Sequence, residues 1–372
     1  MIERPAIIVV AYSARALASS ANRAGFAPLA IDVFGDDDTR EMTLASVKLD
    51  GGLSDGLAPD NVVVAVETLI RANDPIGLVY GSGFEHQPET IAAIACETRV
   101  FGNDAETVKR AKDPLALARL CEANGVRHPQ IQFAPPDEPE LWLMKRQGGA
   151  GGAHVAAAAR SSGTLPDGYY QLRMTGTSVS ALFLASGRKA EIIGLSLQWT
   201  APTPASPFRY GGAAGPVDVG PAQSEEIARI VAIVASELNL VGLNSADFLV
   251  SRDAVWLIEI NPRPGATLDV FESNDETLFA RHAAACEGRL VPTPPSLVFK
   301  AAEIVYAPHD IVLREGRNWP DWVVDRPAPG TRIAAGDPLC TALACGASVD
   351  LARACATERA RGIIARVQEE ED

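Results

Sequence analysis

Apolar runs of the length of a buried strand alternate with amphipathic stretches in the first 80 residues. Residues 6–11, 28–33 and 76–80 form the apolar runs, and residues 14–24 and 62–72 have helical periodicity. Successive strands and helices of this kind are typical of a doubly wound parallel sheet. This part of the chain is therefore predicted to be an α/β domain of the Rossmann type.

Helical and extended patterns also follow one another in the middle of the chain. Residues 104–124 have helical periodicity and end at Asn124-Gly125, a common helix stop. Residues 224–238 carry one apolar helical stripe, and residues 179–184 and 191–199 are predicted strands of a single sheet. Further elements are predicted as strands at 141–145 and 154–156 and as helices at 267–287 and 349–368.

Two strand-like runs near residue 250 are predicted to form a hairpin. Residues 246–250 and 255–261 alternate in the manner of strands, and Ser251-Arg252-Asp253-Ala254 between them is predicted to form the turn. If Ser251 pairs with Val255, the loop has three residues. This register fixes which side chains of the two strands meet.

In that register, Asp247 lies opposite Glu259, and the strand alternation adds Asn261 to the same face. Leu257 is also predicted on this face. The opposite face is predicted to carry Trp256, Ile258 and Ile260. Three oxygen-bearing side chains therefore converge at the end of one strand.

Oxygen ligands of this kind suit Mg2+ or Mn2+, and Mg2+ commonly binds one or two carboxylates together with substrate phosphates. Arg263, just after the strand, would add a guanidinium fork that matches a phosphoryl group. The alternative is that Glu259 caps an edge strand and Asn261-Pro262 opens a turn. The hairpin alone leaves both interpretations open.

A lysine and a glycine-rich loop form a second candidate phosphate site. Lys145 lies on a predicted strand that leads into Gln147-Gly148-Gly149-Ala150-Gly151-Gly152. Backbone N–H groups can approach phosphates closely where no Cβ intervenes. The strand, loop, strand order differs from the phosphate loops that open helices. A plain hairpin is the alternative interpretation.

Candidate substrate residues lie at the ends of the amino-terminal strands. Ser13 and Arg15 stand at a predicted helix start, where they could hold an anion or serve as a helix cap and a surface charge. Residues 81–85 follow a strand end, where open sheets bind ligands, although their glycines can also simply make the bend. The turn after the first strand lacks the Gly-x-Gly-x-x-Gly fingerprint of dinucleotide-binding proteins.

Composition excludes several classes of protein. Hydrophobic residues make up 47% of the 372 residues and charged residues 22%, which is typical of a globular chain. The formal net charge of -14 argues against nucleic acid or an anionic membrane as partner. The six scattered cysteines suggest neither a zinc site nor a disulfide framework. The first apolar run is too short for a signal sequence or a membrane span, so we expect a cytoplasmic protein.

Taken together, Asp247 and the motif Glu259-Ile260-Asn261-Pro262-Arg263-Pro264-Gly265 resemble the metal and phosphate motif of the ATP-grasp ligases. In that family an acid, a glutamate and an asparagine hold two Mg2+ ions against the ATP phosphates. The resemblance extends to Lys112 before a helix and to Lys145 with its glycine loop. Many members carry an arginine two residues before the first acid, where this chain has Ser245.

The resemblance implies roles for individual residues. Asp247, Glu259 and Asn261 would bind metal, and Arg263 and Lys145 would act in catalysis. The residues implied in ATP binding are Lys112, Lys145, Gly148, Gly149, Gly151, Gly152, Gln171, Leu172 and Arg173. Many relatives place a glutamate shortly after Gly176, where this chain continues Thr177-Ser178-Val179-Ser180, so contacts to the ribose are not assigned.

The implied fold has an amino-terminal Rossmann-like domain at 1–104 and an ATP-grasp domain at 105–290 with a lid at about 138–200. A small carboxyl-terminal β-rich domain at 291–372 would follow, after a proline-rich linker at 292–296. The acidic residues 369–372 are predicted to form a solvated tail.

The implied activity is an ADP-forming ligation of a carboxylate to an amine through an acyl phosphate, with ATP and Mg2+ or Mn2+ as cofactors. The expected partners are small-molecule substrates, and a homodimer is one expected assembly. The substrate residues suggested are Ser13, Arg15, Gly83, Glu85, Gln198 and Arg209, of which Arg209 serves equally well in a structural role.

Residues 81–85, Gln198 and the short carboxyl-terminal segment are similar to ATP-grasp proteins of methanofuran-type cofactor synthesis, in which glutamate is joined to tyramine or a related amine. Three other interpretations stay open. The chain could be an amino-acid ligase like that of pyrrolysine synthesis, a carboxylase that uses bicarbonate, or a nucleotide-binding regulator without catalysis.

Overall fold

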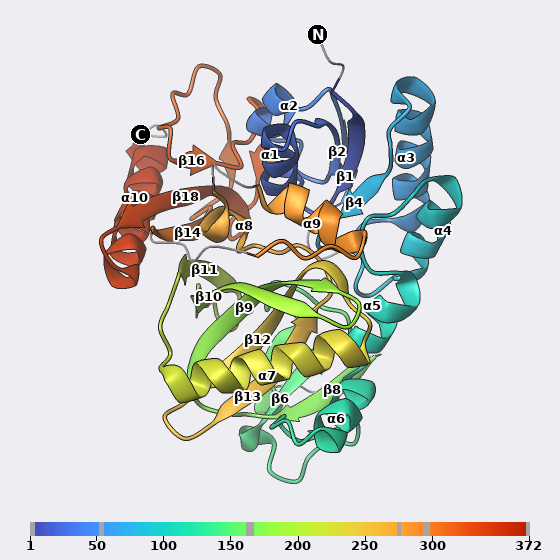
Figure 1. Cartoon of the computed structure of the whole chain (residues 1–372). Coiled ribbons are helices and arrows are strands. Elements are labelled where there is room, and N and C mark those ends of the chain that lie inside the picture. Colours follow the sequence, from blue (N-terminus) through green and yellow to red (C-terminus); the bar gives the residue numbers. More distant parts are fainter. Residues whose placement is uncertain (1–3, 52–55, 161–166, 274–276, 293–297, 370–372) are drawn as a thin grey trace.

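The computed structural model describes the chain except for residues 1–3, 52–55, 161–166, 274–276, 293–297 and 370–372. Most of the predicted linker at 292–296 and of the acidic tail therefore lies outside the described residues. The fold is α/β, as predicted, with a parallel sheet near the amino terminus and a larger antiparallel sheet beside it (Figure 1).

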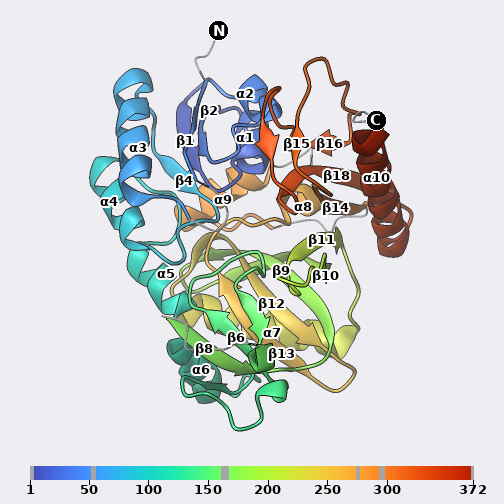
Figure 2. The ribbon, with the colours of Figure 1, turned by 180° about the vertical axis from the view of Figure 1, so that it is seen from behind.

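The amino-terminal sheet is parallel, with strand order β3-β2-β1-β4. Its elements are β1 (Ala6–Val10), α1 (Arg15–Arg23), β2 (Ala27–Asp32), α2 (Asp37–Met42), β3 (Ala45–Lys48), α3 (Pro59–Asn73), β4 (Leu78–Tyr80) and α4 (Glu89–Glu97). Ile7 and Val9 pack in one core with residues of α1, whereas Ile8 and Val10 pack in another with residues of α3 and α4. Figures 1 and 2 show these helices on opposite sides of the sheet. The doubly wound prediction is confirmed.

Eight antiparallel strands form the large sheet, in the order β13-β12-β9-β10-β11-β14-β18-β16. They are β9 (Thr177–Ser186), β10 (Ala190–Thr200), β11 (Tyr210–Gly215), β12 (Val241–Val250), β13 (Val255–Asn261), β14 (Phe299–Tyr306), β16 (Val323–Val324) and β18 (Pro338–Gly346). The predicted strands 179–184 and 191–199 belong to β9 and β10, which pair directly. That prediction is confirmed.

The carboxyl-terminal segment extends this large sheet. β14 pairs with β11, so strand pairing crosses the predicted boundary at residue 291. The helix α10 (Val349–Glu369) packs on β14 and β18, and β15 (Ile311–Val312) pairs with β17 (Arg332–Ile333). We retain the division into 1–104, 105–290 and 291–372 as a proposal about domains.

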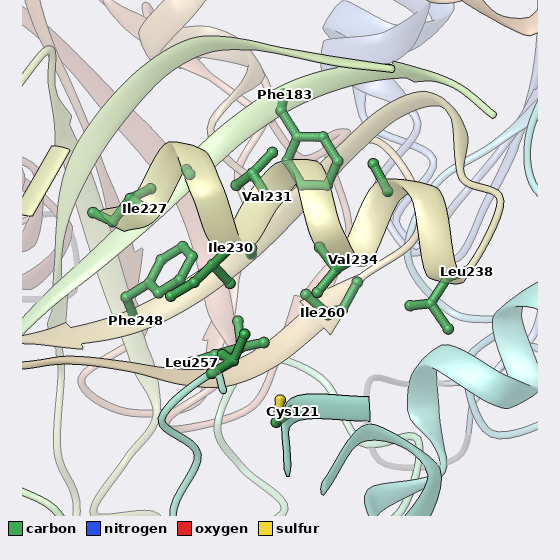
Figure 3. Close-up of a cluster of buried hydrophobic side chains, with 14 of the residues drawn as sticks. Cys121, Phe183, Ile227, Ile230, Val231, Val234, Leu238, Phe248, Leu257 and Ile260 are labelled. Carbon is green, nitrogen blue, oxygen red and sulfur yellow. The ribbon is translucent and has the colours of Figure 1, made fainter. Parts of the chain in front are cut away.

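Helix α7 (Pro221–Glu237) covers one face of the large sheet and builds its main core. Ile227, Ile230, Val231 and Val234 are fully buried, as the apolar stripe predicts. Figure 3 shows them against Phe183, Phe248, Leu257 and Ile260 of the sheet. Each such aliphatic side chain stabilises the fold by about 1.5–3 kcal/mol through burial.

A second antiparallel sheet is smaller, with strand order β5-β8-β6-β7. Its strands are β5 (Ile131–Gln132), β6 (Trp142–Arg146), β7 (Val155–Ala157) and β8 (Gly168–Leu172), with single 3-10 turns at Pro139–Leu141 and Ala158–Arg160. The glycine loop joins β6 to β7, as predicted.

The predicted helix at 104–124 is two helices, α5 (Ala105–Lys112) and α6 (Pro114–Ala123). Asp113 between them has extended backbone angles, because Pro114 disfavours a helical residue before it. The Asp113 carboxylate accepts the N–H groups of Leu115 and Ala116 and caps α6. Lys112 therefore ends one helix just before the next begins.

Two further helices, α8 (Leu268–Phe271) and α9 (Leu278–Cys286), occupy the predicted helical region at 267–287. Leu278 and Phe279 of α9 share a core with Leu17 of α1 and Leu182 of β9. The amino-terminal domain and the large sheet are thus joined through α9.

The hairpin of β12 and β13 confirms part of the predicted register and corrects the rest. Asp247 pairs with Glu259, as predicted, but Val250 pairs with Val255, so the loop has four residues. On the loop side of Ile258, Phe248 pairs with Leu257, one position away from the predicted register. A bulge around Ile258 then adds one residue to β13 and restores the predicted pairing of Asp247 with Glu259.

The bulge also changes which side chains share a face. Leu257 and Ile260 lie in the same core, both at 0% exposure, although strict alternation predicts opposite faces for them. The prediction that Leu257 shares a face with Glu259 is therefore wrong. One extra residue before Glu259 turns the polar end of β13 away from the core beneath α7.

No helix among the described residues is long and apolar enough to cross a membrane.

Candidate active site

Asp247 and Asn261 meet at the end of the hairpin, beside Glu259. Asn261 Nδ2 donates to Asp247 Oδ2 at 3.0 Å, and Asp247 pairs in register with Glu259. Asn261 is 8% exposed. The structure thus brings the three predicted metal ligands together.

Lys112 reaches this group from the last turn of α5. Its Nζ donates to Glu259 Oε1 and, at 2.7 Å, to Asn261 Oδ1. The lysine is buried, at 8% exposure. A positive charge therefore already stands between two of the three predicted metal ligands.

The two carboxylates have opposite pKa shifts. Burial would raise the pKa of Glu259, but Lys112 and Lys145 outweigh it and lower the pKa to about 2. Burial and the charge of Glu259 raise the pKa of Asp247 above its usual range. The site thus holds one firmly ionised carboxylate and one that would gain from an added cation.

Arg263 is tied to the amino-terminal domain. Its Nε donates to Glu85 Oε1 at 2.7 Å, and its Nη2 lies 3.4 Å from Asn261 Oδ1. Glu85 Oε2 accepts the N–H of Gly83 at 2.8 Å. The residues predicted to contact substrate, Gly83 and Glu85, therefore lie beside the predicted phosphate-binding arginine.

The glycine loop makes close contacts that only glycine permits. A Cβ on Gly148 would lie 2.6 Å from the Glu85 carbonyl oxygen, and one on Gly152 would lie 1.9 Å from the Phe208 carbonyl oxygen. Both glycines have positive φ. Tyr210 donates its N–H to the Gly151 carbonyl at 2.9 Å. The loop thus packs against the turn after β4 and the start of β11.

Lys145 lies on β6, the strand that leads into the glycine loop, and its side chain is buried. Its Nζ donates to Gln171 Oε1 at 3.3 Å, which joins two residues predicted to bind ATP. The N–H groups of Leu172 and Arg173 donate to the carbonyls of Gln130 and Leu141, both at 2.8 Å. The adenine contacts predicted at Leu172 and Arg173 stay predictions.

A narrow cleft lies between α5, the start of α6, the glycine loop and β13. Lys112, Gly148, Gly149 and Glu259, all predicted site residues, line it. Other residues that line the cleft, among them His128, His154, Tyr169 and Ile258, were not predicted as site residues from the sequence. Two of these residues lie next to a predicted motif in the sequence, since His154 follows the glycine loop and Ile258 precedes Glu259. That closeness was the signal that could have identified them as site residues.

Both cleft histidines are held neutral. Burial lowers the pKa of His154 to about 4, and the neighbouring Lys145 and Lys112 add to this effect. Burial and Lys145 likewise lower the pKa of His128 to about 4. The positive charge of the cleft at neutral pH therefore comes from lysine and arginine.

Ser13 and Arg15 lie apart from this group. Arg15 pairs with both Asp269 oxygens at 2.6 Å and with Asp325, and Ser13 Oγ donates to Asp325 at 3.1 Å. Ser13 does not cap α1, since Ala14 is the capping residue and no side-chain bond is made there. The cap interpretation is wrong, and so is the surface-charge interpretation, because Arg15 is buried. An anion would have to compete with two carboxylates for Arg15.

Arg209 and Gln198 also have protein partners. The Arg209 guanidinium donates to the carbonyls of Ala201 and Gly336 and stacks 3.5 Å over the Tyr306 ring. These contacts favour its structural alternative. Gln198 Nε2 lies 3.5 Å from Asp247 Oδ1, so it adjoins the predicted metal ligands.

The donor set fits Mg2+ bound together with a phosphate. Asp247, Glu259 and Asn261 offer hard oxygen atoms, which Mg2+ and Mn2+ prefer. In the described part of the chain, no group of three or more His, Cys, Asp or Glu side chains is arranged to hold a metal. Two carboxylates and a carboxamide would therefore need ligands from a nucleotide to complete the shell.

Comparisons with known proteins agree with this arrangement. Residues 111–267 match the family model of the ATP-grasp domain, which spans Lys112, the glycine loop and the β12–β13 hairpin. A comparison with curated protein sequences found no match.

Solved structures with a similar fold include three enzymes. The biotin carboxylase domain of Hydrogenobacter thermophilus 2-oxoglutarate carboxylase, solved with MgADP and bicarbonate, has 11% identity and a TM-score of 0.69, over 90% of this chain and 85% of that one. The L-amino acid ligase of Bacillus licheniformis has 14% identity and a TM-score of 0.67, over 96% and 97% of the two chains. Thermotoga maritima N5-carboxyaminoimidazole ribonucleotide synthetase has 12% identity and a TM-score of 0.67, over 96% and 98%.

At these identities the likeness to the solved structures shows the fold alone. The family match covers residues 111–267, so this part of the chain is an ATP-grasp domain.

Proposed function

We propose that the chain is an ADP-forming ligase that joins a carboxylate to an amine through an acyl phosphate, with ATP and Mg2+ or Mn2+. The observation that carries the proposal is that Asp247, Glu259 and Asn261 meet Lys112, and that Lys112 and Glu259 line one cleft together with Gly148 and Gly149 of the glycine loop. The family match and the ligase among the similar structures support it.

In this proposal the cleft binds the nucleotide phosphates. Lys112 and Lys145 contribute positive charge, and the N–H groups of the loop at 148–152 approach the phosphate oxygens. Asp247, Glu259 and Asn261 would hold Mg2+, which supplies charge neutralisation on the phosphates. Once ATP and metal bind, Lys112 would turn from Glu259 and Asn261 toward a phosphate.

The first step forms an acyl phosphate. A substrate carboxylate oxygen attacks the γ-phosphorus, and the bond from that phosphorus to the bridging oxygen breaks, so ADP leaves with the electron pair. Charge spreads over the transferring phosphoryl oxygens. Arg263, fixed beside Asn261, and Lys145 would stabilise that charge.

The second step forms the amide. The amine nitrogen attacks the acyl carbon, the bond from that carbon to the phosphate oxygen breaks, and phosphate leaves while the nitrogen loses a proton. The residues act by positioning and charge, without a covalent bond to the protein. Gly83, Gln198 and the turn at 81–85 adjoin the site, and we propose that the acceptor binds there.

A screen of the purified chain with Mg-ATP tests the proposal. ADP and phosphate release would be measured across amino acids, other carboxylates and aryl amines, with the joined product identified by mass spectrometry. We expect release that requires one carboxylate and one amine together. Nucleotide binding without turnover across the panel would favour a regulator instead.

A bicarbonate-dependent carboxylase is the second candidate, because two of the similar structures named above belong to carboxylating enzymes or their domains. It predicts ADP formation that bicarbonate stimulates without an amine. The same screen, run with and without bicarbonate, separates the two candidates.

Narrower assignments also belong to the proposal. Glutamate as the carboxylate and a methanofuran-type pathway stay predictions, as do an amino-acid ligase of the pyrrolysine type, a homodimer and a cytoplasmic location. Ser13 and Arg15 are the weakest of the proposed substrate residues, because Arg15 already pairs with Asp269 and Asp325. Arg209 is similarly held by protein contacts.

A further inference from the structure

We infer that Glu85 is a positioning residue, which sets the orientation of Arg263 from the amino-terminal domain and acts on the reaction through that arginine. The turn that carries Glu85 also supports the glycine loop. This inference rests on the proposed function, in which Arg263 contacts the γ-phosphoryl group.

Both oxygens of Glu85 are engaged. Oε1 accepts Arg263 Nε at 2.7 Å, and Oε2 accepts the N–H of Gly83 at 2.8 Å. The residue is 4% exposed, and burial would raise its pKa, but Arg263 and Lys112 lower it below the usual range. Glu85 is therefore an ionised, buried partner of Arg263 rather than a free ligand for a substrate.

The contact fixes the direction of the guanidinium. Because the group is planar, a partner on Nε sets the plane in which Nη1 and Nη2 point. Nη2 then lies 3.4 Å from Asn261 Oδ1, and Nη1 lies 3.4 Å from the Pro264 carbonyl oxygen. Glu85 thus directs Nη2 of Arg263 toward Asn261, one of the proposed metal ligands.

The same turn meets the glycine loop. A Cβ on Gly148 would lie 2.6 Å from both the Glu85 carbonyl oxygen and His86 Cα. The loop backbone therefore packs directly on the residues that hold Arg263. Arg263 and the glycine loop, which are both proposed to act on the nucleotide phosphates, thus both contact the same turn of the amino-terminal domain.

The test compares binding of two nucleotides by titration calorimetry. The variants are Glu85→Gln, Arg263→Lys and the double variant. Gln keeps the shape of Glu85 but loses its charge and one acceptor, so Arg263 loses its fixed orientation. Because Arg263 addresses the γ-phosphoryl group, Glu85→Gln should weaken Mg-AMPPNP binding by about 10-fold or more and change Mg-ADP binding less than about twofold.

Glu272→Gln is the matched control. Glu272 is also buried, and its carboxylate pairs with Arg23 of α1 at 3.3 Å. The substitution therefore removes the charge of a buried carboxylate that pairs with an arginine, as Glu85→Gln does. We expect Kd values within about twofold of wild type for both nucleotides, since outer-shell effects require contact with a site residue.

The double variant separates positioning from general structure. If Glu85 acts through Arg263, then Glu85→Gln in the Arg263→Lys chain should weaken Mg-AMPPNP binding by less than about threefold. An equal loss in both backgrounds, or an equal loss for both nucleotides, would overturn the inference. Where Glu85→Gln fails to fold, Glu85→Asp keeps the charge, shortens the reach and must show the same selective loss.

Failure of the proposed function has a different signature. A wild-type chain that binds neither Mg-AMPPNP nor Mg-ADP overturns that proposal. A wild-type chain that binds both, with a Glu85→Gln variant indistinguishable from it, overturns the inference about Glu85 alone.

Discussion

Replacing Glu259 by Gln tests the most strongly ionised group of the site. The substitution keeps the size of the side chain and removes the negative charge that pairs with Lys112. Asn261 would still accept from Lys112 at 2.7 Å, so the lysine keeps one partner. The change therefore isolates the charge of a single carboxylate in the proposed metal and phosphate site.

The charge that the substitution removes is fully present at neutral pH, because Lys112 and Lys145 lower the pKa of Glu259 against the effect of burial. Loss of one preorganised electrostatic group in an active site commonly lowers kcat by about 100- to 1,000-fold, or about 2.7–4 kcal/mol. We therefore expect kcat to fall by more than about 100-fold.

The assay is ADP formation under saturating substrates, with thermal unfolding measured on the same samples. Glu272→Gln, a buried carboxylate paired with Arg23, serves as the control and should retain near wild-type kcat. Glu259 is ionised throughout the range from pH 5 to 8, so the residual activity should show no new pH limb there. A Glu259→Gln chain with near wild-type kcat would remove this residue from the mechanism.

Three further predictions concern the lid, the core and pH. Gly148→Ala should raise the KM for ATP at least about 10-fold more than Gly151→Ala. Both glycines have positive φ, so alanine costs about 1–2 kcal/mol at either position, but of the two only a Cβ on Gly148 would meet backbone atoms within 4 Å. Equal effects of the two substitutions would refute the close contact. Ile230→Ala should lower the free energy of unfolding in urea by about 2–5 kcal/mol, because Ile230 is fully buried on the face of α7 that packs against the large sheet, and a loss under about 1 kcal/mol would contradict that packing. Burial and the charges of Asp325, Asp32 and Asp38 raise the pKa of Asp36 to about 8, so the folded state holds a proton that the unfolded state releases near pH 4, and stability falls as pH rises from about 4 to 8. Asp36→Asn should therefore raise the melting temperature more at pH 8 than at pH 5, and an equal shift at both would refute the argument.

The sequence predicts the elements whose patterns are local. The apolar stripe of α7 and the alternating strands β9 and β10 follow from periodicity within each segment. The glycine loop between two strands was also predictable, because it depends on residues close together in the chain. The predicted Asp247–Glu259 pairing is correct, but only because the bulge offsets the longer loop.

Other features depend on contacts that no local pattern records. The bulge near Ile258 falls in a run of apolar residues, Trp256 to Ile258, where alternation cannot reveal an extra residue. Arg15 looks like an anion site in the sequence, but its carboxylate partners lie 254 and 310 residues away. The pairing of Arg263 with Glu85 likewise spans 178 residues.

The central claim is that Asp247, Glu259 and Asn261 bind a divalent metal tightly when a nucleotide supplies further ligands, and weakly without it. Electron paramagnetic resonance of Mn2+ measures this most directly, through the Kd of the metal with and without AMPPNP. The account predicts weak Mn2+ binding to the chain alone, at least about 10-fold tighter binding with AMPPNP, and loss of that gain in Asp247→Asn. Mn2+ binding that AMPPNP does not strengthen, or a gain that survives in Asp247→Asn, would contradict it.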